Sequence, residues 1–308
     1  MEVLVVGSCN TDLISYVPEL PRPGETVSGT RFKTGCGGKG ANQCVMAARL
    51  GVSTAMVAKV GNDQFGRDAI QNFRDNNVNV DHVTVTREAH SGVASITVND
   101  RGENCIVIVS GANMTLSPAD VQAAAHLIRG SKVVVCQLEV PPDTSLEALR
   151  LAKQNGVLTI FNTAPAVPLS DDFFHSTDIL VLNETEAEVL TGIPVGDVET
   201  AKQAVNRLLA RGPGCVVLTL GAGGVVFSGR GSEDTDTLTH IPAESVATVD
   251  TTGAGDAFVG AMAYYLSRQR ELAFSEVVRR SGVIASHTTT LPGTQTSYQV
   301  NILPPGLT

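Results

Sequence analysis

The sequence predicts an α/β fold in which helices cover a mainly parallel sheet through right-handed crossovers. Short, uninterrupted Val/Ile/Leu runs are typical of strands buried on both faces of a parallel sheet, and segments of helical periodicity separate them. In addition, two stretches of period-2 alternation indicate a smaller β structure outside this body. The predicted buried strands are Val3–Val6, Val57–Val60, Val133–Leu138, Leu158–Phe161, Ile179–Leu182 and Val216–Leu220.

Cap and turn residues mark the helices between these strands. A helix predicted over Ala41–Leu50 ends before Gly51, a residue type favoured just beyond a helix. Ser117 followed by Pro118 predicts a helix start, and Asp120 suits the positive end of that helix. One apolar face then comprises Val121, Ala124, Ala125 and Ile128, and two further helices are predicted over Leu146–Gln154 and Thr200–Arg211.

The two period-2 stretches are residues 13–34 and 91–110. In the second, Ser95–Val98 and Asn104–Ile108 flank a turn near Asp100–Gly102, which predicts a β-hairpin. The stretches form either a small antiparallel lid over the α/β body or ordinary edge strands.

Length and composition narrow the classes of function. A chain of 308 residues suits one large or two medium domains, and 43% hydrophobic residues argue against intrinsic disorder. The net charge of −9 argues against a nucleic-acid-binding surface and a polybasic membrane anchor. No apolar stretch approaches the roughly 18 residues that a membrane helix needs. We expect no signal peptide, because no basic segment followed by an apolar one opens the chain.

Other common site types are not expected. The six cysteines include no C-x-x-C pair, which predicts buried, reduced thiols in the cytosol. The six histidines are scattered without an H-E-x-x-H or i, i+4 pair, so a transition-metal site is not predicted. The absence of G-x-S-x-G disfavours an α/β-hydrolase.

The segment Gly35–Gly40 is rich in glycine and precedes a predicted helix. It formally matches G-x-G-x-x-G, but it does not follow the first buried strand, so it is weak evidence for a dinucleotide. It is not a P-loop, because Lys39 is followed by Gly40 and not by Ser or Thr. Bare backbone, the Lys39 cation and Asn42 suit recognition of a hydroxyl-rich small molecule.

The most informative segment, Asp250–Asp256, precedes an apolar helix predicted over Ala257–Leu266. Small residues at the start of a helix leave N–H groups unpaired, and with the helix dipole they favour an anion such as phosphate. Asp256 lies in the first turn, where it either complements the dipole or acts as a catalytic carboxylate beside the anion.

Polar residues also follow three buried strands, at the sheet edge where parallel folds bind ligands. Asn183–Glu186 could hold phosphates and a hydrated Mg²⁺, or cap a helix, or do both. Thr219–Gly224 forms either a nucleotide loop or a plain turn. Glu139 follows a third strand and is a functional candidate, with a solvent-facing turn as the alternative.

Taken together, these segments resemble the ribokinase family of carbohydrate kinases, within the PfkB group. Five blocks match in order over nearly the whole chain: Gly7–Asp12, Gly37–Gln43, Asn183–Glu186, Thr219–Gly221 and Asp250–Asp256. The last block is highly specific to the PfkB group. The resemblance implies a three-layer α/β/α sandwich with a mainly parallel central sheet and a small β-sheet lid, in which the lid is also a dimer interface.

The resemblance also implies a role for each matching residue. Asp256 is implied to be the general base that takes the proton of the sugar 5-hydroxyl, and Glu186 to hold Mg²⁺ through water. Backbone amides of Gly253, Ala254, Gly255 and Asp256 are implied to form the anion hole for the transferred phosphoryl group. The implied ribose contacts are Asn10, Asp12, Gly38, Lys39, Asn42, Glu139 and Asp256. The implied nucleotide contacts are Asn183, Thr219, Gly221, Gly224, Gly255 and Gly282. The implied potassium ligands, largely backbone oxygens, are Asp250, Thr252, Thr288, Leu291, Gly293 and Ser297.

We therefore expect ATP-dependent phosphorylation of D-ribose at O5, with Mg²⁺ accompanying ATP and K⁺ as a monovalent activator. We expect a single catalytic domain over residues 1–308 with a lid from residues 13–34 and 91–110, and a homodimer formed through that lid. The expected location is the cytoplasm, with the nucleus as an addition, and no nucleic-acid or membrane partner is expected. The alternatives are another PfkB-type kinase acting on deoxyribose or adenosine, a non-catalytic sugar-sensing protein on this fold and, least favoured, an NAD oxidoreductase.

Overall fold

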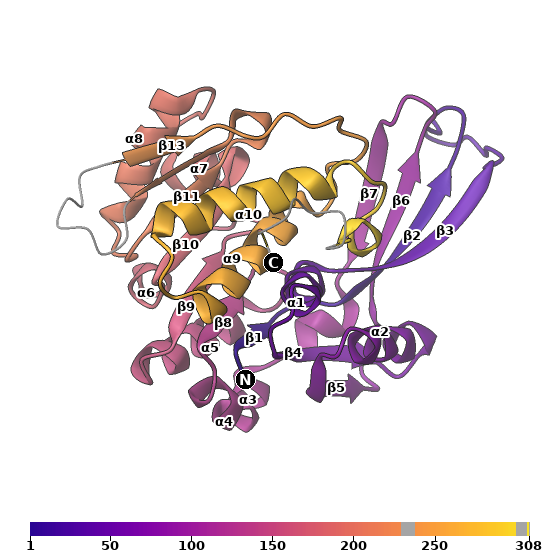
Figure 1. The fold of residues 1–308 in the computed structure, drawn as a ribbon. Helices are drawn as coiled ribbons and strands as arrows, with labels where there is room; N and C mark the ends of the chain where they lie inside the picture. The colour runs from indigo at the N-terminus through magenta and orange to yellow at the C-terminus, as the bar shows by residue number, and fades with distance from the viewer. Residues whose placement is uncertain (229–237, 300–306, 308) are drawn as a thin grey trace.

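The centre of the computed structural model, which describes residues 1–228, 238–299 and 307, is a nine-stranded sheet (Figure 1). Every neighbouring pair from β11 to β5 is parallel, and β12 and β13 extend the sheet antiparallel. The order across the sheet is β13 (Leu238–Ile241), β12 (Val225–Ser228), β11 (Val216–Thr219), β10 (Ile179–Asn183), β9 (Leu158–Asn162), β8 (Val133–Cys136), β1 (Val3–Val6), β4 (Thr54–Gly61) and β5 (Asn79–Thr86). All six predicted buried strands are confirmed.

Alternate residues of these strands enter two separate hydrophobic cores. In β1, Val3 and Val5 belong to one core and Leu4 and Val6 to the other, and all four are 0% exposed. Burial on both faces explains why the strands are continuously apolar. Because helices supply the other half of each core, the body has the expected three layers.

The helices are distributed over the two faces of the sheet (Figure 1). One core includes residues of α1 (Lys39–Arg49), α2 (Gln64–Asp75), α9 (Ala254–Arg268) and α10 (Phe274–Thr288). The other includes residues of α3 (Pro118–Ala123), α4 (Ala125–Arg129), α5 (Pro142–Gln154), α6 (Asp171–His175), α7 (Glu184–Thr191) and α8 (Val198–Leu209). The cap at Ser117 is confirmed, but the single face predicted after it is divided between α3 and α4 at Ala124.

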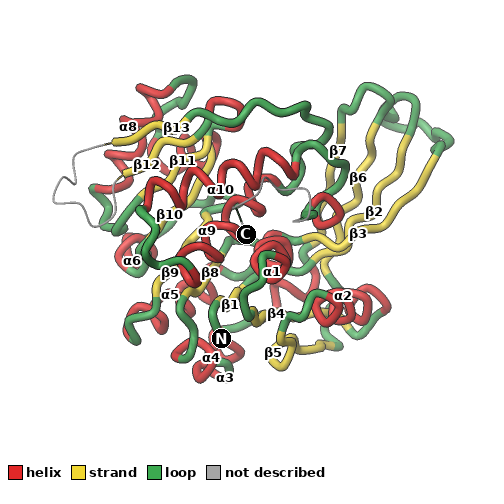
Figure 2. The backbone as a smooth tube through the Cα atoms, viewed as in Figure 1, coloured by secondary structure: helices red, strands yellow, loops and turns green. Residues whose placement is uncertain are grey.

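A second, four-stranded sheet projects from this body (Figure 1). Its order is β3 (Arg31–Gly37), β2 (Asn10–Tyr16), β6 (Gly92–Val98) and β7 (Asn104–Val109). The predicted hairpin is confirmed, since β6 and β7 pair antiparallel with Val98 opposite Asn104. The connections within the β2–β3 and β6–β7 pairs contain no helix, as Figure 2 shows.

Within the described part of the chain, no helix is long and apolar enough to cross a membrane. None of the six cysteines forms a disulfide within the described residues, and four of them are buried: Cys9, Cys44, Cys136 and Cys215.

Candidate active site

Polar residues gather at the carboxyl edge of the central sheet, where five parallel strands end. Ser8, Glu139 and Asn162 follow or terminate β1, β8 and β9, and Asn183 and Thr219 are the last residues of β10 and β11. The register of β10 and β11 places Asn183 directly beside Thr219. This edge is where open parallel sheets bind their ligands, as the sequence predicts.

Helix α9 begins with a turn that leaves backbone N–H groups open. Gly253 adopts the left-handed region with a φ of 78°, and a Cβ there would lie 2.3 Å from Thr294 Cγ2, so glycine is required. The Ala254 N–H donates to a carbonyl of the preceding turn at 3.2 Å. Among the described residues, the N–H groups of Gly255 and Asp256 find no backbone acceptor. Nothing lies within 4 Å of the Cβ position of Gly255, so the positive helix end has room for an anion.

The Asp256 carboxylate is buried at this turn and is held by α1. Its Oδ2 accepts a hydrogen bond from Asn42 Nδ2 at 2.9 Å, and its Oδ1 accepts one from Gln43 Nε2 at 2.9 Å. With 7% of the residue exposed, the carboxylate is largely desolvated. A buried carboxylate beside open helix N–H groups can accept a proton from an alcohol as that alcohol attacks a bound phosphoryl group.

Glu139 is fixed by donors from two different loops. Its Oε2 accepts a hydrogen bond from Ser8 Oγ at 2.6 Å and another from the Lys39 backbone N–H at 2.9 Å. Gly38 has a φ of 90°, and any Cβ at this position would lie 2.8 Å from the Asn10 backbone nitrogen. The glycine therefore lets the start of α1 pack closely against the loop after β1. The end of β8, the loop after β1 and the start of α1 are thereby joined.

Four carboxyl groups and one ammonium shape the electrostatics of this site. Burial raises the pKa of Asp12, and the charges of Glu139 and Asp256 raise it further, to about 6. Burial also raises the pKa of Asp256, although the Lys39 charge and the amide donors oppose that rise. Burial lowers the pKa of Lys39, but the nearby Asp256, Glu139 and Glu186 charges outweigh it, so the net shift is upward. The excess of negative charge favours a bound cation.

The second sheet contributes two of the predicted sugar contacts. Asn10 begins β2 and Asp12 follows two positions later, which places both on one face of the strand. Asn113 Nδ2 donates to Asn10 Oδ1 at 2.7 Å, and Asn113 Oδ1 accepts from the Cys9 N–H at 2.9 Å. A Cβ at Gly37 would lie 2.4 Å from Asp12 Oδ1, so this glycine leaves room for the carboxylate.

Asn183 and Glu186 form a capping box at the start of α7. The Glu186 N–H donates to Asn183 Oδ1 and the Asn183 N–H donates to Glu186 Oε2, both at 2.9 Å. The helix-cap alternative is therefore correct, but it does not remove these residues from the site. Glu186 is 8% exposed, and burial raises its pKa while the Lys39 charge lowers it, which places the two side chains in one electrostatic environment.

The other predicted nucleotide contacts lie on two separate elements. Thr219 ends β11, and the exposed η2 turn (Gly221–Gly223) with Gly224, whose φ is 95°, forms the loop beyond it. Gly282 lies half-buried on α10, with nothing within 4 Å of its Cβ position. Among the described residues, no hydrogen bond links Gly282 to the rest of this set.

Predicted potassium ligands meet where the segment before α9 lies against the segment after α10. Asp250 Oδ1 accepts from the Thr252 N–H at 2.9 Å, and its Oδ2 accepts from the Gly293 N–H at 2.8 Å. The Asp250 N–H donates to the Thr289 carbonyl at 3.0 Å. Of the remaining predicted ligands, Thr288 and Leu291 lie at the end of α10 and just beyond it, and Ser297 lies in η3 (Gln295–Ser297).

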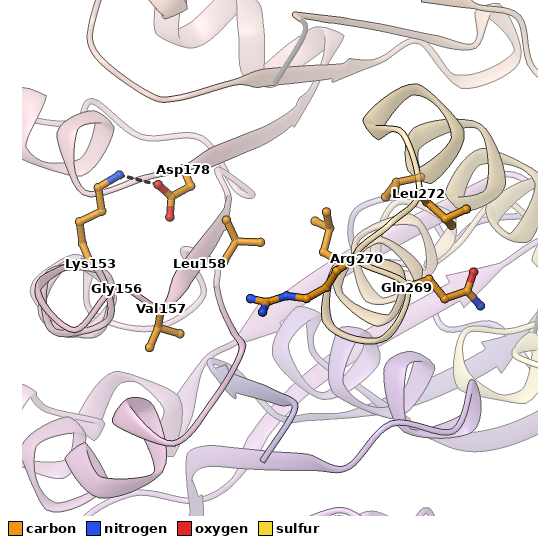
Figure 3. A pocket seen from close by; sticks show the side chains of 10 residues that line it. Lys153, Gly156, Val157, Leu158, Asp178, Gln269, Arg270 and Leu272 are labelled. Carbon is orange, nitrogen blue, oxygen red and sulfur yellow. Dashed lines mark hydrogen bonds and ion pairs between the residues drawn. The ribbon is translucent and has the colours of Figure 1, made fainter. Parts of the chain in front are cut away.

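Two cavities of the described structure lie away from these residues. One, of about 390 Å³, opens near the amino ends of β9 and β10, where Lys153 pairs with Asp178 and the Arg270 side chain points toward Leu158 (Figure 3). The other, of about 410 Å³, lies on the second sheet around Phe32. Neither contains a predicted site residue, so the convergence of charged and polar groups favours the carboxyl edge as the active site.

Sequence reasoning missed Ser8, Gln43, Asn113 and Asn162 as site residues. Ser8 and Gln43 lie inside the matching blocks Gly7–Asp12 and Gly37–Gln43, so their position beside predicted site residues could have indicated them. Asn162 directly follows a predicted buried strand, in the same position as the recognised strand-end residues. Asn113 lies in the segment Gly111–Asn113, which resembles the ribokinase family, but its pairing with Asn10, 103 positions away, leaves no local signal.

Comparisons with known proteins agree with this geometry. The family model described as pfkB family carbohydrate kinase matches residues 1–301. The chain is 50% identical to mouse ribokinase over 297 residues, covering 96% of this chain and 91% of that protein. It is 38% identical to a deoxyribokinase of Salmonella typhi over 299 residues, covering 97% and 95% respectively. The structure of Arabidopsis thaliana ribokinase complexed with ribose and ATP superposes with a TM-score of 0.86 at 30% identity, covering 96% of this chain and 95% of that one.

Proposed function

The chain belongs to the pfkB family of carbohydrate kinases, and we propose that it transfers the γ-phosphoryl group of ATP to O5 of D-ribose. The products are D-ribose 5-phosphate, ADP and a proton. The observation that carries this proposal is the buried Asp256 carboxylate beside the open N–H groups of α9. The sugar is supported by mouse ribokinase at 50% identity and by the similarity to a ribokinase structure that holds ribose and ATP.

Asp256 acts as the general base in this proposal. It orients the ribose 5-hydroxyl and accepts its proton as the new O–P bond forms, so a carboxylate of low basicity suffices. The anion hole at Gly253, Ala254 and Gly255 stabilises the charge of the transferred group through backbone N–H groups and the helix dipole. Since the Ala254 N–H is engaged within its turn, the amides of Gly255 and Asp256 carry most of this role.

The ribose site lies between the second sheet and the start of α1. Hydroxyl groups need both donors and acceptors, and the carboxylates, amides and ammonium here supply both. The proposed contacts are Asn10, Asp12, Gly38, Lys39, Asn42 and Glu139. Because Asn10 and Asp12 come from the second sheet, we propose that this sheet acts as a lid that helps to exclude water from the phosphoryl group.

We propose that the nucleotide contacts are the strand-end residues Asn183 and Thr219, the loop residues Gly221 and Gly224, and the glycines with open space at their Cβ positions, Gly255 and Gly282. Glu186 fits a Mg²⁺ ion bound through water, because Mg²⁺ keeps its waters and prefers few direct carboxylates. When bound with ATP, Mg²⁺ neutralises the charge of the phosphates. This neutralisation matters in a site where carboxyl groups outnumber ammonium groups.

We also propose a monovalent cation site for K⁺ around Asp250. Its carboxylate accepts hydrogen bonds from the Thr252 and Gly293 N–H groups, which holds these two backbone segments close together. The remaining proposed ligands are Thr288, Leu291 and Ser297, through backbone oxygens for the most part. Oxygen donors and one carboxylate suit a hard cation.

The homodimer that we propose forms through the lid is supported by strand β7. This edge strand exposes a row of large apolar side chains: Ile106 (47%), Val107 (58%), Ile108 (52%) and Val109 (45%). Exposed apolar edge strands pair with another chain unless something covers them, and a second copy would cover this one. We also propose a cytoplasmic location, which six cysteines without a disulfide among the described residues support.

The test is ATP consumption measured with D-ribose, 2-deoxy-D-ribose, D-fructose and adenosine, with Mg²⁺ and with and without K⁺. We expect the highest kcat/KM for D-ribose and a product whose phosphate is on O5 by ³¹P–¹H NMR. A higher kcat/KM for deoxyribose or adenosine than for ribose would show that this acceptor, and not ribose, is the substrate. Sugar binding without any ATP consumption would instead favour a non-catalytic sugar sensor.

A further inference from the structure

The Asp256 carboxylate is one end of a chain of buried amide side chains. Gln43 Nε2 donates to Asp256 Oδ1 at 2.9 Å and to Asn162 Oδ1 at 3.0 Å. Gln43 Oε1 accepts from Gln137 Nε2 at 2.6 Å. These residues come from α1, α9, β9 and the loop after β8, so Gln43 joins four parts of the fold at one point.

The direction of the Gln43 amide is determined by its neighbours. Asn162 Nδ2 donates to the Val181 carbonyl at 3.2 Å, and a backbone carbonyl can only accept. The Asn162 oxygen therefore faces Gln43, which in turn must present its NH₂ group to Asn162 and Asp256. Gln43 consequently donates to the carboxylate and cannot be exchanged for an acceptor without breaking this network.

Gln43 has almost no exposed surface with which to contact a substrate. It is 1% exposed, whereas the neighbouring Asn42 holds the other carboxylate oxygen and is also a proposed ribose contact. Of its three side-chain partners Asn162, Gln137 and Asp256, only Asp256 has a proposed catalytic role, so we expect an effect of Gln43 on turnover to pass through Asp256. This separates Gln43 from the ribose contacts, which act on the substrate directly.

We propose that Gln43 is a positioning residue that holds the Asp256 carboxylate in the orientation that receives the proton of the acceptor hydroxyl. The inference rests on the proposed kinase function, in which Asp256 is the base. Two donors, one on each oxygen, fix both the rotamer and the tilt of the carboxylate. The loss of one donor leaves the carboxylate free to rotate about the remaining bond.

The donor also keeps the carboxylate ionised. Burial raises the pKa of Asp256, and the side-chain hydrogen bonds from Asn42 and Gln43 are among the interactions that lower it. Removal of the Gln43 donor therefore raises the pKa of Asp256 further. On the acid limb of the pH profile, kcat falls as the base becomes protonated, so this limb moves to higher pH.

The test compares Gln43→Met, which is close in volume and has no N–H donor, with the wild-type enzyme and its preferred sugar acceptor. We expect kcat per folded site to fall about 10- to 100-fold, as for a misplaced catalytic group. The ribose Kd from calorimetry stays within about threefold, since no substrate contact is lost. The acid limb of kcat moves to higher pH. A crystal structure of the variant should find the Asp256 side chain rotated.

Cys44→Ala is the matched control, because Cys44 is the next residue of α1, is fully buried and does not touch Asp256. It should lower Tm but leave kcat per folded site and the acid limb unchanged. If Gln43→Met does not fold, Gln43→Leu also removes the donor without adding a charge, and it should lower kcat per folded site and move the acid limb in the same direction.

An unmoved acid limb with kcat within threefold of wild type would overturn the proposal, and so would a fall in folded protein alone. A rise in ribose Kd that matches the whole loss of kcat/KM would also overturn it, because Gln43 would then act on binding. Failure of the proposed function is recognised separately, since the wild-type enzyme itself would then not phosphorylate any of the sugars.

Discussion

Replacement of Asp256 by Asn tests the base directly. The substitution keeps the size of the side chain and removes its ability to take a proton. General base catalysis contributes about 10²- to 10⁴-fold, so kcat should fall by about that factor. At 1.36 kcal/mol for each tenfold change in rate, the loss corresponds to about 2.7–5.4 kcal/mol of transition-state stabilisation.

The hydrogen bonds around Asp256 determine what else Asp256→Asn changes. Asn42 and Gln43 both present N–H donors, because Gln295 donates to the Asn42 oxygen at 3.0 Å and Gln137 donates to the Gln43 oxygen. The new Asn can accept from only one of them, and its own NH₂ faces the other donor. The cost of that contact opposes the gain from removing a buried charge, so Tm should change by only a few degrees.

The measurement is single-turnover and steady-state ADP release by purified Asp256→Asn, with ribose Kd from calorimetry. We expect the large loss to lie in kcat and the Kd to stay within about threefold, because the Asn42, Lys39 and Glu139 contacts persist. A kcat within tenfold of wild type would refute the assignment of Asp256 as the base. A ribose Kd raised a hundredfold with kcat unchanged would make Asp256 a binding residue instead.

Three further predictions concern the sugar, the anion hole and the dimer. Asp12→Ala should raise ribose KM at least tenfold with kcat nearly unchanged. Because the pKa of Asp12 is raised to about 6, the ribose KM of the wild type should also rise as this carboxylate protonates below about pH 6. A wild-type KM that stays constant in steady-state assays from pH 5 to 8 would contradict this. Gly255→Ala should keep or raise Tm but lower kcat, because its Cβ would enter open space in which we propose that the phosphoryl group lies. The control Gly253→Ala should lower both, since its Cβ would lie 2.3 Å from Thr294 Cγ2. Thermal melts and ADP release measure the two effects, and unchanged turnover in Gly255→Ala would show that the phosphoryl group does not lie in that space. Val107→Lys should convert a dimer to monomers in analytical ultracentrifugation, and a monomeric wild type would exclude the interface.

The sequence predicts the centre of the fold better than its edges, for a physical reason. Strands buried on both faces, such as β1, need apolar residues at every position, so they appear as uninterrupted runs. In the edge strand β5, polar residues separate Val80, Val83 and Val85, so the strand has no such run. Helix α10 was not predicted either, because Gly282 and several β-branched residues weaken its helical pattern.

The site divides in the same way between local and long-range information. Asp256 and the glycines before it could be found because small residues and a carboxylate close together at a helix start are a local pattern that favours an anion site. The partners that orient Asp256 could not, since Asn42 and Gln43 are 214 and 213 positions away in the chain. Spacing along a sequence says nothing about such pairs until the topology brings the two helices together.

Helix α1 combines sugar binding with orientation of the base. Lys39, Asn42 and Gln43 stand at positions i, i+3 and i+4, so they share one face of the helix. The backbone of the first is bonded to Glu139, and the other two hold the carboxylate of Asp256. A displacement of α1 must therefore change sugar affinity and turnover together. Substitutions confined to one contact of this face should separate the two effects.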